Sequence, residues 1–173
     1  PGWMSFNSSA RRVAGPGLAS AVSEVLAASG LRPELLRLEL TETALLRAGH
    51  SAAVELDAVR DLGVHVGMDD FGTGYSSLTN LQRLPIDFLK IDRSFVSEIS
   101  QDSSEAAVTS TIIAMAHSLR LKVVAEGVET RGQLGFLDAR SCDEAQGYLF
   151  SPALNRADFL KATMDPDFTR ESA

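Results

Sequence analysis

The sequence has a single cysteine, Cys142, in its 173 residues. One thiol cannot form a disulfide within the chain, so covalent cross-links do not hold this fold together. This fits a reducing compartment, and we predict a cytoplasmic protein. Cys142 itself is predicted to be buried rather than reactive.

Long apolar runs and an excess of positive charge are also missing. No stretch approaches the roughly 18 to 20 apolar residues of a membrane span, and no signal peptide is recognisable, so we expect a soluble domain without membrane contact. The 16 basic residues are outnumbered by 23 acidic ones, which gives a formal net charge of -7. A nucleic-acid polymer is therefore not expected as a partner, and an anionic ligand would need metal ions.

What the sequence does contain is a regular alternation of short apolar runs with helical patterns. This rhythm is typical of parallel βα units, and the length suffices for one domain with a core. The predicted strands are residues 3–6, 35–40, 64–68, 88–91, 122–125 and 145–150. The predicted helices are residues 17–29, 51–62, 77–84, 105–119, 130–137 and 157–162.

The most informative stretch is residues 63–77, GVHVGMDDFGTGYSS. A buried strand is predicted to end on two adjacent carboxylates, Asp69 and Asp70, before a glycine loop. Neighbouring residues at a strand end point to opposite sides, so this pair suits two cations that activate water for attack on a phosphate. The alternative interpretation is that Asp70 only caps the helix after the loop, and residues 63–77 alone do not decide between the two.

Polar residues gather near the ends of all six predicted strands. In a (β/α)₈ barrel that rim carries the active site, whereas an open doubly wound sheet gathers such residues near one switch point. We therefore predict an α/β protein with a (β/α)₈ TIM-like barrel. The polar residues are Asn7, Glu39, Asp69, Asp70, Asp92, Glu126 and Gln146.

Each candidate also has a structural interpretation. Asn7 alone is better explained as a turn residue. Glu39 and Lys90 lie on strands with two buried faces, where an unpaired charge is costly, so a functional role is favoured for both.

The remaining polar residues and the histidines allow plainer explanations too. Glu126 and Asp92 would suit the start of a loop, and Gln146 would suit an ordinary surface. His65 and His117 sit in apolar runs and are predicted to be packing residues, while His50 is predicted to be exposed.

Six motifs, FNSSA, ELTE, DDFGTGYSSL, LKIDRSFV, VVAEGVET and QGYLF, resemble those of the EAL domain family in order and spacing. The resemblance assigns residues 1–165 to such a domain and leaves 166–173 as a loose tail. It implies hydrolysis of one phosphodiester bond of cyclic di-GMP, a bacterial second messenger, to the linear dinucleotide with Mg²⁺ or Mn²⁺. It also implies a homodimer within a longer signalling protein.

The resemblance further implies a role for each matching residue. Lys90 would lie beside the attacking water, and Glu126 would be a metal ligand or general base. Glu42 would hold the glycine loop, which takes part in dimer contacts. The first metal would be bound by Asn7, Glu39 and Asp69 and the second by Asp70 and Asp92, while Gln146, Glu129, Gly72, Thr73 and Gly74 would support the site or the substrate.

One departure from the family concerns the start of the barrel. The first two strands of the family, including the Glu-Ala-Leu strand, have no counterpart here, and a complete barrel takes about 250 residues. We expect the 173 residues alone to have weak or no activity. The alternative function is a non-catalytic module that binds cyclic di-GMP or a protein. Smaller departures are the direct junction of Ser151 with Pro152 and Ser141 in place of a glycine.

Overall fold

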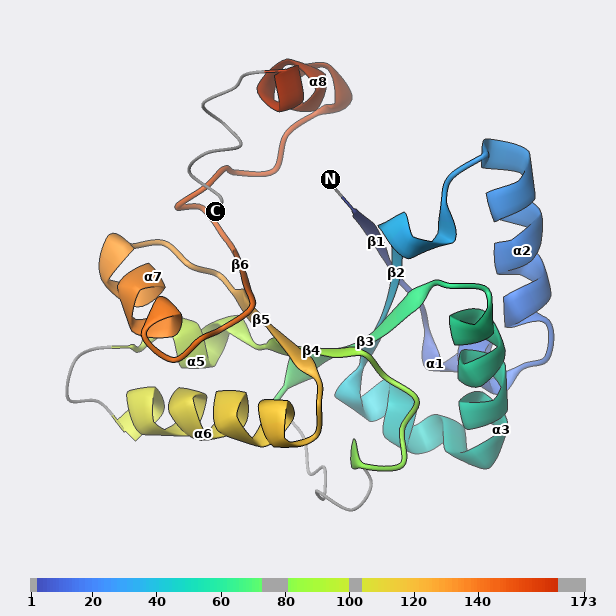
Figure 1. The fold of residues 1–173 in the computed structure, drawn as a ribbon, viewed down its shortest axis with the longest axis horizontal. Coiled ribbons are helices and arrows are strands. Elements are labelled where there is room, and N and C mark those ends of the chain that lie inside the picture. The colour runs from blue at the N-terminus through green and yellow to red at the C-terminus, as the bar shows by residue number, and fades with distance from the viewer. Residues whose placement is uncertain (1–2, 73–80, 100–103, 165–173) are drawn as a thin grey trace.

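The computed structural model describes residues 3–72, 81–99 and 104–164 (Figure 1). Its six strands form one parallel sheet in sequence order. The strands are β1 (Met4–Asn7), β2 (Leu36–Thr41), β3 (His65–Phe71), β4 (Phe88–Ile91), β5 (Lys122–Glu126) and β6 (Glu144–Gln146).

Helices connect the strands, as the sequence rhythm predicts. Figure 1 shows α1 to α3 grouped beside β1 to β3, α5 to α7 grouped beside β4 to β6, and α8 standing apart beyond β6. The helices are α1 (Ala10–Ala14), α2 (Leu18–Ser29), the 3₁₀ turn η1 (Pro33–Leu35), α3 (Glu42–Asp61), α5 (Arg93–Ser97), α6 (Ser104–Ser118), α7 (Arg131–Asp138) and α8 (Arg156–Met164). No helix in these described segments is long and apolar enough to cross a membrane.

The sheet is strongly curved, as a barrel requires. Arg37 on β2 donates two hydrogen bonds of 2.6 Å to Glu144 on β6, although three strands separate β2 from β6. In a flat sheet those strands would lie about 19 Å apart, beyond the combined reach of the two side chains. The prediction of a barrel-type α/β fold is therefore confirmed, with six strands forming part of the barrel.

The core lies between the sheet and its helices. Leu38, Val66, Leu89 and Val123 on the four central strands are fully buried. Buried parallel strands read as continuous apolar runs because both faces are covered. Charged residues interrupt these runs on the opposite face of the sheet, and those interruptions build the candidate site.

Several boundaries differ from the predicted ones. Helix α3 begins at Glu42, much earlier than residue 51, because Thr41 caps it by accepting a hydrogen bond from the backbone of Ala44 at 3.3 Å. Strand β6 ends at Gln146 rather than at residue 150, since a turn follows at Gly147. The first half of the predicted helix at residues 77–84, residues 77–80, lies outside the described residues.

The prediction for the two histidines was wrong. His65 is exposed, and its Nδ1 lies 3.9 Å from Asp87, while the Nε2 of exposed His117 lies 2.9 Å from an oxygen of Asp143. Both occur next to apolar residues in the sequence but lie where a strand starts or a helix ends. His50 lies among residues whose side chains are not described.

Cys142 is partly buried and packs against the core, as predicted. Burial raises the pKa of its thiol to about 11, so the thiol is almost entirely protonated at neutral pH.

Candidate active site

Lys90 is the centre of a buried charge cluster. It lies on β4, the fourth strand of the six, and is only 5% exposed. Its Nζ donates to Glu39 on β2 at 2.8 Å, lies 3.1 Å from Asp69 on β3, and contacts Glu126 on β5. A buried ammonium group is costly without partners, so these carboxylates compensate its charge.

The environment shifts the pKa of both Lys90 and Glu126. Burial would lower the pKa of Lys90, but its hydrogen bonds to Glu126 and Glu39 outweigh burial and raise it. Burial raises the pKa of Glu126, and the bond from Lys90 opposes that rise only in part. The amide of Gln146 on β6 donates to Glu126 at 2.8 Å and orients its carboxylate.

Asp69, Asp70 and Glu126 each place a carboxylate oxygen within 4.8 Å of the others. Strict strand alternation would separate the two aspartates, and that expectation was wrong. The pairing of β3 with β4 shifts between Met68 and Phe71, and Asp70 has a left-handed φ of 55°. The bulge therefore keeps both carboxylates in one cluster, within β3 rather than beyond its end.

Burial and neighbouring charged residues change the pKa of Asp70. Burial, followed by the nearby Asp69 and Asp92, raises the pKa of the Asp70 carboxyl, while Lys90 lowers it. Mutually repelling carboxylates of this kind are stabilised by a cation. Their hard oxygen donors suit Mg²⁺, Mn²⁺ or Ca²⁺, so the residues present fit a divalent metal site.

Glu42, the first residue of α3, is 1% exposed and contacts the start of the glycine loop. Its Oε2 accepts a hydrogen bond from the backbone N–H of Gly72 at 3.2 Å. Gly72 has a φ of 101°, and an added Cβ would lie 2.5 Å from the ring of Phe95, so only glycine fits here. Thr73 and Gly74 lie outside the described residues.

The other predicted residues lie around this cluster. Asp92 caps α5 by accepting a hydrogen bond from the backbone of Ser94 at 2.9 Å. Asn7 is exposed at the end of β1 and pairs in register with Glu39. Glu129 is also exposed and lies 3.8 Å from a guanidinium nitrogen of Arg93.

The sequence reasoning missed two residues that adjoin Glu126. Arg93 and Tyr148 line a hollow of about 260 Å³ together with Glu126 and Gln146. Both were detectable, because Arg93 directly follows Asp92 at a strand end and Tyr148 lies two positions after Gln146.

Fold and site together define a barrel-type α/β protein with a carboxylate cluster at the carboxyl ends of its strands. The chain belongs to the EAL domain family, whose model matches residues 1–153. The prediction from the six sequence motifs is thereby confirmed.

Two relatives are similar over most of the chain. A Pseudomonas aeruginosa protein named cyclic di-GMP phosphodiesterase NbdA is 49% identical over 152 residues, which cover 84% of this chain and 19% of NbdA. The solved structure "PaMucR Phosphodiesterase, c-di-GMP complex" is 41% identical with a TM-score of 0.85, and the match covers 91% of this chain and 70% of that one.

A third comparison concerns a structure with a metal. Klebsiella pneumoniae BlrP1, solved as a manganese and cyclic di-GMP complex, is 31% identical with a TM-score of 0.78, over 87% of this chain and 38% of that one. The chain thus spans about a fifth of the length of curated relatives such as NbdA.

Proposed function

We propose that this domain hydrolyses one phosphodiester bond of cyclic di-GMP to give the linear dinucleotide. The observation that carries this proposal is the contact of Lys90 with carboxylates from β2, β3 and β5 at one end of the sheet. The relative named a cyclic di-GMP phosphodiesterase and the PaMucR complex with c-di-GMP support the choice of substrate.

We also propose a two-metal site that takes Mg²⁺ or Mn²⁺. Such ions, when bound, lower the pKa of a coordinated water and offset the phosphate charge. The manganese complex of BlrP1 supports this proposal, as does the spacing of Asp69, Asp70 and Glu126. The first ion would be held by Asn7, Glu39 and Asp69 and the second by Asp70 and Asp92.

The chain's own residues supply the remaining chemistry. Glu126 accepts a proton from the attacking water, and its raised pKa makes it a better base than an ordinary carboxylate. The water oxygen bonds to phosphorus as the phosphorus–oxygen bond to one ribose breaks, and the leaving oxygen takes up a proton from the solvent. Lys90 stays charged and stabilises the negative charge that develops on the phosphoryl oxygens.

Other residues are proposed to position this machinery. Gln146 fixes the carboxylate of Glu126, and Glu42 holds the backbone of Gly72 at the start of the glycine loop. That loop, with Thr73 and Gly74, is proposed to contribute to a homodimer, and Glu129 to support the site through Arg93. We place the domain in the cytoplasm, within a longer signalling protein.

The test is to incubate the full-length protein with cyclic di-GMP and Mn²⁺ and to separate the products by chromatography. We expect the linear dinucleotide to accumulate and EDTA to stop its formation. Calorimetric binding of cyclic di-GMP without any turnover would overturn the enzyme proposal and establish the non-catalytic module instead. The Glu39→Gln variant, which removes a proposed metal ligand and is expected to be inactive, serves as the control for contaminating phosphodiesterases.

A further inference from the structure

Gln133 is a buried polar residue that lies outside the carboxylate cluster. It belongs to the first turn of α7, and only 7% of its surface is exposed. Its Oε1 accepts hydrogen bonds from the backbone of Glu129 at 2.8 Å and of Thr130 at 2.9 Å. Its Nε2 donates to the backbone carbonyl of Val96 on α5 at 3.1 Å. One amide side chain therefore joins α5 to the loop between β5 and α7.

The two segments that Gln133 joins each follow a carboxylate of the candidate site. Helix α5 begins directly after Asp92, which caps it, and the loop of residues 127–130 begins directly after Glu126. Asp92 and Glu126 therefore leave neighbouring strands at the same level of the sheet. The residues that precede them are partners in the parallel pairing of β4 with β5, namely Ile91 and Ala125.

The loop of residues 127–130 also packs directly on the start of α5. Gly127 has a φ of 70°, and an added Cβ would lie 2.5 Å from the Cγ of Arg93. Arg93 and Glu129 approach each other to 3.8 Å, but both are exposed and solvent screens their attraction. The hydrogen bond from Gln133 to Val96 is buried, so the amide group would be costly to leave unpaired. Gln133 therefore fixes the buried end of this contact.

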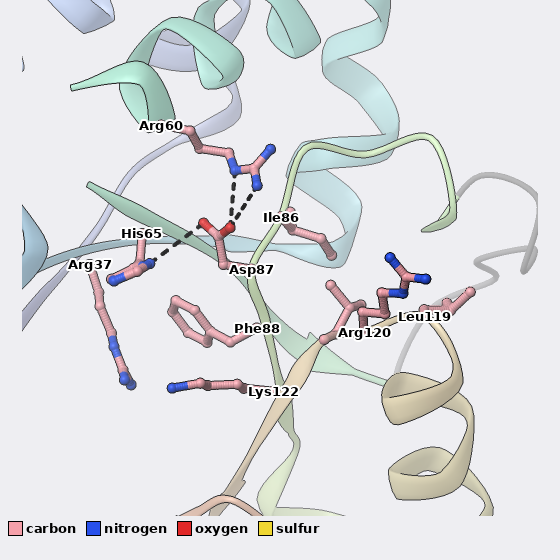
Figure 2. Close-up of a pocket in the computed structure, with 10 residues that line it drawn as sticks. Arg37, Arg60, His65, Ile86, Asp87, Phe88, Leu119, Arg120 and Lys122 are labelled. Atoms are coloured by element: carbon pink, nitrogen blue, oxygen red, sulfur yellow. Dashed lines mark hydrogen bonds and ion pairs between the residues drawn. The ribbon is translucent and has the colours of Figure 1, made fainter. Parts of the chain in front are cut away.

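The start of β4 is fixed separately, at the opposite end of the sheet. Figure 2 shows Arg60 and His65 facing Asp87, which directly precedes β4. One oxygen of Asp87 accepts from Arg60 at 2.8 and 3.1 Å, and the other accepts from the backbone of Val66 at 2.8 Å. These bonds hold the strand without α5 or α7. Loss of the Gln133 hydrogen bond should therefore free α5 and leave β4 in place.

We propose that Gln133 is a positioning residue that sets the separation of Asp92 from Glu126 by joining α5 to the loop after β5. It acts through Asp92, the proposed ligand of the second ion, and through Glu126, the proposed base. Hydrogen bonds behind the ligands of a metal site typically contribute about 10- to 100-fold to metal affinity or activity. This role rests on the proposed function and assigns part of the metal affinity to a residue of α7.

Three substitutions separate this role from the stability of α7. Thr130 and Gln133 form a capping box, in which the Thr130 hydroxyl accepts from the backbone of Gln133 at 3.2 Å. Gln133→Glu keeps the acceptor oxygens that such a box uses, but an ionised carboxylate cannot donate to Val96. Gln133→Met removes the amide without adding a charge. Thr130→Val removes the cap and keeps the amide of Gln133, so it is the matched control.

The test is Mn²⁺ binding by the full-length protein, measured from the electron paramagnetic resonance signal of the free ion. This measurement does not depend on turnover. We expect Gln133→Glu and Gln133→Met each to weaken one Mn²⁺ site about tenfold or more. The Mn²⁺ concentration that gives half the maximal rate should rise by the same factor, while KM for cyclic di-GMP at saturating Mn²⁺ changes little. Thr130→Val should unfold at a lower temperature but bind Mn²⁺ like the wild type.

Thermal unfolding shows which variants are folded, and Gln133→Met alone decides the test if the buried charge of Gln133→Glu prevents folding. Wild-type Mn²⁺ affinity in the folded Gln133 variants, or an equal loss of affinity in Thr130→Val, overturns the role of Gln133 even if the native protein hydrolyses cyclic di-GMP. Mn²⁺ binding that depends on Gln133 in a protein without turnover supports the positioning role and overturns the proposed hydrolysis. A native protein that binds no Mn²⁺ overturns both.

Discussion

Replacing Lys90 tests whether the positive charge of this residue, rather than the size of its side chain, is needed for catalysis. Methionine has a similar length and no charge, so Lys90→Met leaves Glu39, Asp69 and Glu126 without their shared cation. We expect the rate of linear dinucleotide formation at saturating Mn²⁺ to fall about 100-fold or more, because the developing phosphoryl charge loses its stabilising partner. Affinity for cyclic di-GMP should change much less.

Lys161→Met serves as the control for this prediction, because Lys161 pairs only with Asp158 on the same exposed helix among the described contacts. It should keep the native rate. A Lys90→Met protein that is folded by circular dichroism and still hydrolyses cyclic di-GMP at a near-native rate would rule out the proposed role of the ammonium group.

At this scale the sequence identifies buried charges better than it identifies their geometry. Lys90 and Glu39 interrupt apolar strands, and the cost of burying a charge was enough to predict a partner for each. The arrangement of Asp69 and Asp70 was not predictable, because a bulge and a left-handed backbone override strand alternation there. The contact between Glu42 and Gly72 was expected only from the family resemblance.

Among the elements, α2 depends on a carboxylate from another helix. Glu55 on α3 accepts hydrogen bonds from the backbone of Gly17 at 3.1 Å and of Ala19 at 3.3 Å, at the start of α2. These bonds lower the pKa of Glu55. A carboxyl whose pKa is lower in the folded state stabilises the protein at higher pH, and this contribution is lost as the pH falls through the folded value.

We therefore expect Glu55→Gln to reduce the free energy of unfolding at pH 7. The reduction should be less than about 1 kcal/mol, because solvent screens the interaction of the Glu55 carboxylate with the start of α2. The difference from the wild type should shrink as the pH drops below the ordinary value of 4.5. Urea denaturation at several pH values measures it. Glu24→Gln on α2 is the control, and an effect of Glu55→Gln that does not vary with pH would contradict the explanation.

The contact of β3 with β4 requires a residue without a side chain. An added Cβ at Gly67 would lie 2.1 Å from the ring of Phe88, which is 2% exposed. The added methyl group would force the Phe88 ring out of its packed position, so Gly67→Ala should reduce the free energy of unfolding by about 1–3 kcal/mol. Urea denaturation followed by circular dichroism tests this.

Gly135 provides a control of opposite sign. It lies in helix α7, and nothing lies within 4 Å of the position of an added Cβ. Gly135→Ala should stabilise the protein by about 0.5–1 kcal/mol through helix propensity. If the two substitutions have the same effect, packing against Phe88 is not what requires glycine at position 67.

The elements themselves were predictable where their pattern is strong. Strand β4 and the cap of α7 at Thr130 match the sequence-based expectations. The first part of α3 was missed because Thr41 starts the helix before its apolar spacing becomes regular. The length of β6 was overestimated, since the apolar residues after Gln146 continue into a turn that packs on Val128.

For the whole molecule, the barrel-type fold was predicted from polar residues at the ends of all six strands. The ion pair between Arg37 and Glu144, which joins β2 to β6 across the curved sheet, was not predicted. Arg37 and Glu144 are 107 positions apart in sequence, and neither was predicted to have a structural or functional role. Their pairing depends on the curvature of the finished sheet, and the ring of Trp3 lies 3.6 Å from the Arg37 guanidinium. No local pattern contains that information.

The Arg37–Glu144 ion pair also affects the candidate site, because Glu144 lies on the same strand, β6, as Gln146, which orients Glu126. We expect Arg37→Met and Glu144→Gln each to reduce the free energy of unfolding by about 2–4 kcal/mol, since each leaves a partly buried charge unpaired. The double variant should lose clearly less than the sum, with a coupling energy of about 1–3 kcal/mol. Amide hydrogen exchange should become faster in β6. The control Arg11→Met replaces an exposed residue of α1 and should change neither the free energy of unfolding nor the exchange in β6. Additive losses, or β6 amides that stay as protected as in the wild type, would mean that the curvature of the sheet is maintained without this pair.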